Sequence, residues 1–98
     1  MNLNTALKVM HESGSKLLIP VRMGFFVMIR PVEPGSFDSP SIPDALRKHN
    51  DWLPKCDFVC MPVEVSAEGW REVSEVQGRW VQWALEEADI KRDTFMVV

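Results

Sequence analysis

A chain of 98 residues is long enough for a single domain with one modest core. The formal charge of −3 argues against a protein that binds nucleic-acid polymers, because such binding depends mainly on Lys and Arg neutralising phosphates. Four Trp, five Phe and six Met are many bulky side chains for this length, so we expect some of them to meet a partner subunit or a ligand.

The amino-terminal half of the sequence predicts one helix followed by a β-hairpin. Asn4 can cap a helix that ends at Gly14. Two β-rich runs, residues 16–21 and 24–31, lie on either side of a short link, which is typical of a hairpin. Because Pro20 lacks a backbone donor, the first of these strands either lies at a sheet edge or bends there.

The middle of the chain predicts a loop, a short helix and a strand. Residues 32–43 are rich in Pro, Gly, Ser and Asp, which is loop composition, and this loop could cover a site. Pro43 suits the first position of a short helix over residues 44–50. Residues 57–63 carry apolar side chains on both faces, which indicates a buried strand.

The segment 66–77 admits two interpretations. The apolar spacing of its Trp and Val residues favours a helix, whereas Glu68 and Gly69 suit a turn. After this segment we expect a strand over 79–83, a helix over 85–91 and a closing strand over 94–98.

The sequence predicts a cytoplasmic protein. The amino end lacks the basic region and apolar run of a signal peptide. The most apolar window, residues 17–29, is interrupted by Pro20 and Arg22 and is shorter than the roughly 20 residues that cross a bilayer. We therefore expect no membrane span.

Neither a disulfide nor a metal site is expected. If Cys56 and Cys60 both lie on the predicted strand, their Cα atoms are about 13 Å apart, beyond the roughly 7 Å limit for a bridged pair. The same distance prevents them from sharing a metal ion. His49 is near in sequence, but a structural zinc site needs four converging ligands.

Residues that could carry catalysis are few. His11 and His49 are the only candidates for the base of a nucleophilic triad, and a solvated side chain explains each more simply. Glu86 and Glu87 are adjacent, so they point to different sides of a helix. The five glycines are scattered and form no phosphate-binding loop. The sequence therefore favours a binding protein over an enzyme and predicts no cofactor.

Three residues near the carboxyl end stand six apart: Trp83, Asp89 and Phe95. An aromatic ring that stacks on a base contributes about 1–3 kcal/mol per base, and a carboxylate can accept hydrogen bonds from ribose hydroxyls. These residue types therefore suit a small nucleotide-like ligand. The alternative is that Trp83 and Phe95 belong to the core and that Asp89 lies at the surface or at a helix end.

The same residues resemble a pattern of the Thoeris anti-defence sponge family, small phage proteins that sequester cyclic nucleotide immune signals. The family pattern is a tryptophan, a short turn into a helix, an aspartate six residues on, and a final strand with an aromatic residue. The matching positions here are Trp83, Asp89, Ile90, Phe95 and Val97.

Upstream, residues 58–61 resemble the apolar strand of the family, and Gly14-Ser15-Lys16 resembles its Gly-x-Lys step. Where the family carries Gly-Trp-Asn-Gly, this chain has Val21-Arg22-Met23-Gly24, so an expected stacking tryptophan is absent. Phe25 or Phe26 could replace it. Residues 32–56 do not match.

The resemblance implies an α+β fold, which with the elements above gives a small antiparallel sheet of about five strands and two to four short helices. It also implies a symmetric homo-oligomer that binds a cyclic ADP-ribose isomer or a cyclic dinucleotide without turnover. In such a site Arg22 and Arg30 face phosphates, Trp83 and Phe25 contact bases, and Asp89 accepts from ribose or base donors.

Two other functions stay open. The chain could be a host-takeover inhibitor that binds a protein target of a bacterial defence system, because Trp and Met are favoured at interface cores. It could also be a small enzyme that degrades immune signals. The sequence does not decide the ligand or the order of the oligomer.

Overall fold

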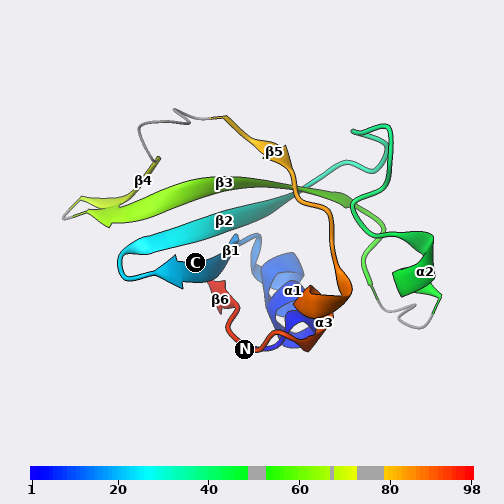
Figure 1. Ribbon diagram of the computed structural model, residues 1–98, viewed down its shortest axis with the longest axis horizontal. Helices are drawn as coiled ribbons and strands as arrows, with labels where there is room; N and C mark the ends of the chain where they lie inside the picture. Colours follow the sequence, from blue (N-terminus) through cyan, green and yellow to red (C-terminus); the bar gives the residue numbers. More distant parts are fainter. Residues whose placement is uncertain (49–52, 67, 73–78) are drawn as a thin grey trace.

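The computed structural model describes residues 1–48, 53–66, 68–72 and 79–98 (Figure 1). Within these residues the chain forms helices and strands in the order α1 (Leu3–Ser13), β1 (Leu17–Arg22), β2 (Phe25–Val32), α2 (Asp44–Arg47), β3 (Asp57–Ser66), β4 (Gly69–Glu72), β5 (Val81–Gln82), α3 (Glu87–Lys91) and β6 (Met96–Val97). This arrangement confirms the expected α+β class.

The strands form one antiparallel sheet in the order β4-β3-β2-β1-β6, and β5 also pairs with β3. β4 pairs with the carboxyl-terminal part of β3, and β5 pairs with its amino-terminal part. The two short strands therefore follow one another along the edge of β3 that faces away from β2. β4 is a strand that the sequence patterns did not favour.

Helix α1 begins two residues earlier than the sequence analysis expected. The side chain of Asn2 accepts a hydrogen bond from the backbone N–H of Thr5 at 2.9 Å, so Asn2 is the N-cap, and Asn4 lies inside the helix. Gly14 ends the helix in the left-handed conformation, with φ of 67°, as expected.

The β1–β2 hairpin is confirmed, and its turn lies at Met23 and Gly24, one residue later than expected. The strand register shifts between Pro20 and Arg22, so the chain bends there. β6 pairs only with Leu17 and Leu18, which leaves Pro20 at a sheet edge as well. Both properties suit a residue without a backbone donor.

Of the two interpretations of residues 66–77, the helix is wrong for residues 69–72, which form β4. Ser66 pairs with Gly69, and β4 runs back along β3 from that point. The turn interpretation of Gly69 was the correct one, since its φ of 116° is a conformation that side chains rarely adopt. Residues 73–77 lie outside the described part of the chain.

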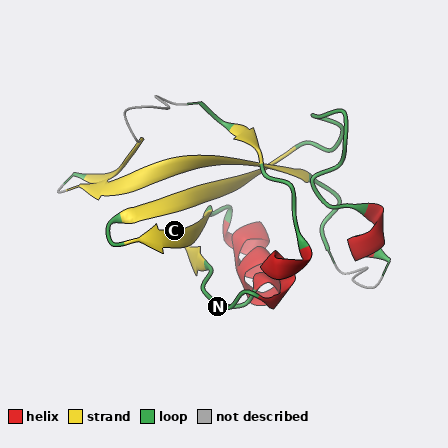
Figure 2. Ribbon diagram, viewed as in Figure 1, coloured by secondary structure: helices red, strands yellow, loops and turns green. Residues whose placement is uncertain are grey.

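The two faces of the sheet are covered differently. Figure 2 shows α1 and α3 side by side, and α1 also packs on β1 and β6. The main core lies under these helices, and it consists of Leu3, Ala6, Leu7, Met10, Leu17, Ile19, Ile29, Ile42, Leu53, Phe58, Leu85 and Phe95. None of the described helices is long and apolar enough to cross a membrane.

A second, smaller apolar cluster lies on the other face of the sheet, which we call the open face. Its buried members are Leu18, Met28, Met61 and Val63, and Phe26 and Trp80 pack against them. No residue of a described helix belongs to this cluster. The open face is therefore built from strands and their flanking segments alone.

Candidate functional site

The ring of Trp83 extends the main core. Its centroid lies 5.6 Å from that of Phe58 and 6.3 Å from that of Phe95, and both contacts are edge-on. The backbone N–H of Trp83 also donates to the carbonyl of Phe58 at 2.9 Å. Because Phe58 and Phe95 are fully buried, Trp83 and Phe95 act together as packing residues beneath the helices.

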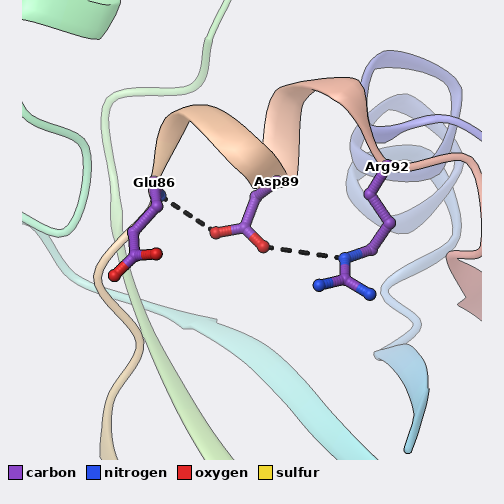
Figure 3. A network of polar contacts seen from close by, with 3 residues as sticks. All are labelled: Glu86, Asp89 and Arg92. Carbon is purple, nitrogen blue, oxygen red and sulfur yellow. Dashed lines mark hydrogen bonds and ion pairs between the residues drawn. The ribbon is translucent and has the colours of Figure 1, made fainter.

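The carboxylate of Asp89 is engaged at the start of α3 (Figure 3). One oxygen accepts a hydrogen bond from the backbone N–H of Glu86 at 2.9 Å, and the other lies 3.7 Å from Nε of Arg92. The Glu86 side chain in turn accepts from the backbone N–H of Asp89, which completes a capping box. Asp89 is 8% exposed, and its carboxylate serves to cap the helix.

Arg22 and Phe25 lie beside the turn between β1 and β2. The guanidinium of Arg22 is 4.3 Å from the centroid of the Phe25 ring, a cation–π contact. With Val27 and Pro62 they border a largely apolar hollow of about 310 Å³. This position is close to the place where the family's stacking tryptophan was expected.

Arg30 lies on the open face, where its guanidinium is 4.6 Å from the centroid of the Trp80 ring. Successive residues of a strand point to opposite faces, so Arg30 and Phe25 belong to different faces of β2. The five residues expected to bind a ligand therefore occupy three places: α3 with the core beside it, the β1–β2 turn, and the open face.

The cysteines are poor nucleophiles. Burial raises the pKa of the Cys60 thiol, and burial together with the neighbouring Asp57 raises the pKa of the Cys56 thiol. At neutral pH both are therefore protonated, whereas the thiolate is the reactive form. No group of three or more His, Cys, Asp or Glu side chains that could hold a metal is found in the described segments, and His49 lies outside them.

The open face was not singled out by sequence, and no described helix covers its apolar cluster. Its hollow of about 560 Å³ is bordered by Met28, Met61, Val63 and Trp70, with Lys16, Glu68 and Arg71 among the charged residues around it. Trp70 is 39% exposed, and its ring meets that of Phe26 edge-on at 4.9 Å.

One signal in the sequence could have revealed this surface. Met61 and Val63 alternate with the residues of β3 that face the helices, and Phe26 and Met28 do the same in β2. Apolar side chains on both faces normally indicate cover on both faces. The described residues form one long helix, α1, which covers only one of the two faces.

Comparison with protein-family models, with curated proteins and with solved structures gives no match for this chain. The functional assignment therefore depends on the residues and geometry described above.

Proposed function

We propose that this chain is a non-catalytic binding protein whose open face contacts a protein partner. One observation carries the proposal: on a face that no described helix covers, Trp70, which is 39% exposed, borders the same hollow as Met28 and Met61. Met96, which is 42% exposed, pairs with Leu18 of the same cluster. Contiguous apolar surfaces of this kind mark interaction sites in soluble proteins.

The composition of the open face suits a protein interface. Trp, Met and Arg are enriched at the centres of such interfaces, and the open face contributes Trp70, Met28 and Arg30. The edge-on contact with Phe26 restricts the Trp70 ring before binding, so less side-chain entropy is lost in a complex. A protein component of a bacterial defence system is the partner class that fits the host-takeover hypothesis.

Affinity capture from a bacterial lysate, followed by calorimetry with the purified captured protein, tests this proposal. We expect one stoichiometric partner to bind the wild type and to lose binding with Trp70→Ala. Met23→Ala is the matched control, because Met23 is apolar and 98% exposed but lies at the tip of the β1–β2 turn. A partner that binds all three proteins equally well, or no partner at all, would refute the role of the open face.

A second candidate function is the sequestration of a cyclic nucleotide signal without turnover, as the family resemblance implies. The observation that favours it is the Arg30–Trp80 pair, which places a guanidinium and an indole 4.6 Å apart. These two groups suit a phosphate and a base. In this version Arg30, Arg22 and Phe25 are available to a ligand, whereas Trp83 and Asp89 would first have to leave the contacts that hold the core and α3.

Heating the purified protein and analysing the supernatant tests the sequestration function. Recovery of an intact cyclic nucleotide, together with stabilisation of the protein by the same compound, would support it. Light scattering would show whether the protein is the expected homo-oligomer. Loss of the added nucleotide would point to an enzyme instead, and the absence of stabilisation at high excess would count against binding.

A further inference from the structure

A further hollow lies between α1 and the segment that leads into β3. It has a volume of about 470 Å³, and the residues around it are Asn4, Leu7, Lys8, His11, Pro54 and Lys55. From its charges and its apolar floor we infer that it binds a small organic phosphate. This site is separate from the open face and does not depend on the function proposed for that face.

Two lysines and a histidine are the ionisable side chains that the described residues contribute to this hollow. Lys8 and His11 are three residues apart and so share a side of α1, and Lys55 faces them from the other wall. Among the described residues no acidic side chain borders the hollow, although the whole chain has 14 acidic residues and only 11 Lys and Arg. The ion pairs found among the described residues use Arg71, Lys91 and Arg92 and involve neither Lys8 nor Lys55.

Arg47 fixes the wall that carries Lys55. Its guanidinium donates to the carbonyls of Leu53 and Pro54, at 2.9 and 3.1 Å. Lys55 and Arg47 both border a neighbouring hollow of about 370 Å³, so Lys55 stands between the two. Arg47 therefore fixes the backbone just before Lys55. Asp38 and Asp57 also border that neighbouring hollow and not the one between α1 and Lys55.

The combination of groups indicates the chemistry of the ligand. Lysine ammonium groups bind phosphate oxygens as point charges, and a histidine ring N–H or an asparagine amide can donate to the same oxygens. Leu7, which is buried, and Pro54 give the hollow an apolar floor. A phosphate ester can use both the cations and the floor, whereas a bare inorganic ion uses only the cations.

Nuclear magnetic resonance titration with ribose 5-phosphate and with pyrophosphate, at ionic strength held constant with NaCl, tests the inference. We expect saturable shifts at residues 4–11 and 53–55. Lys8→Gln and Lys55→Gln should each weaken binding about tenfold, which corresponds to the loss of one charge-assisted contact. Both side chains are exposed, so thermal unfolding should be unchanged and any loss can be assigned to binding.

Lys91→Gln is the matched control, since Lys91 is an exposed lysine on α3 that does not border the hollow. Its affinity for both probes should equal that of the wild type. Shifts that do not saturate, or an equal loss of affinity in Lys91→Gln, would overturn the inference, because either result means general attraction to cationic surface. Partner capture by the open face should be unaffected in all three variants, which separates failure of this site from failure of the proposed function.

Discussion

The carboxylate of Asp57 accepts a hydrogen bond from the backbone N–H of Ser41 at 2.8 Å and so joins the loop after β2 to the first residue of β3. Its other oxygen accepts from the N–H groups of Gly35 and Ser36, at 2.9 and 3.3 Å. The Ser41 hydroxyl accepts from the backbone N–H of Phe58 at 3.0 Å. One carboxylate and one hydroxyl thus hold the loop against the sheet.

Replacement of Asp57 should destabilise the fold. Asp57→Asn loses the charge and turns an N–H-bearing amide toward backbone donors, so we expect the free energy of unfolding to fall by about 1–3 kcal/mol. Urea unfolding at pH 7 measures this change. Asp93→Asn is the control, because Asp93 is exposed and should change stability by less than about 0.5 kcal/mol. Equal stabilities of the two variants would show that the Asp57 hydrogen bonds contribute nothing.

The same hydrogen bonds predict how stability depends on pH. The N–H of Ser41 is the main cause that lowers the pKa of Asp57 below its ordinary value of 3.8, with Gly35 and Ser36 adding to the effect against the opposing burial. Since the folded pKa is depressed, the stabilisation is fully present above the unfolded pKa and is lost as pH falls through the folded pKa.

Urea unfolding from pH 6 down to pH 2 should therefore show a steeper loss of stability in the wild type than in Asp57→Asn, so that the stability difference present at neutral pH shrinks at acid pH. Parallel curves for the two proteins would mean that another carboxyl group controls the acid transition. Asp93→Asn should follow the wild type throughout.

Asp89 offers a test that separates a capping residue from a ligand-binding one. Asp89→Ala removes the acceptor for the N–H of Glu86 and the partner of Arg92, so we expect a loss of about 1 kcal/mol in unfolding free energy. Partner or nucleotide binding at saturating concentration should be unchanged, as measured by calorimetry. Loss of binding with unchanged stability would show that Asp89 contacts the ligand and does not act mainly as a helix cap.

Sequence patterns predicted the elements whose signals are local. Gly14 marked the end of α1, and the hairpin was visible in two β-rich runs around Gly24. The segment containing Trp70 was misjudged because its apolar spacing also fits a helix, whereas the interaction that matters is the contact with Phe26, far away in the chain. β4 itself pairs with the preceding strand β3, but a contact such as Phe26–Trp70 between distant residues leaves no mark in a local pattern.

The candidate site was harder to predict for a related reason. Trp83 and Asp89 have the residue types of a nucleotide site, but residue type does not show which groups the fold already uses. The carboxylate of Asp89 accepts a hydrogen bond from a backbone N–H three residues away. The ring of Trp83 packs against two rings of the core. The open face was not predicted because β3 carries apolar residues on both faces, which indicated that both faces were buried. In the structure the helices cover only one of them.

Gly69 links the fold to the proposed function. Its φ of 116° is strained for any residue with a side chain, although a Cβ there would meet no atom within 4 Å, so the cost of Gly69→Ala comes from the backbone and should be about 1–3 kcal/mol. Because Trp70 follows directly, a shifted turn should also displace its ring from Phe26. We expect lower stability in urea and weaker partner binding in calorimetry from the same substitution. Met23→Ala should change neither, and a Gly69→Ala protein that binds its partner normally would show that the position of Trp70 is unimportant for binding.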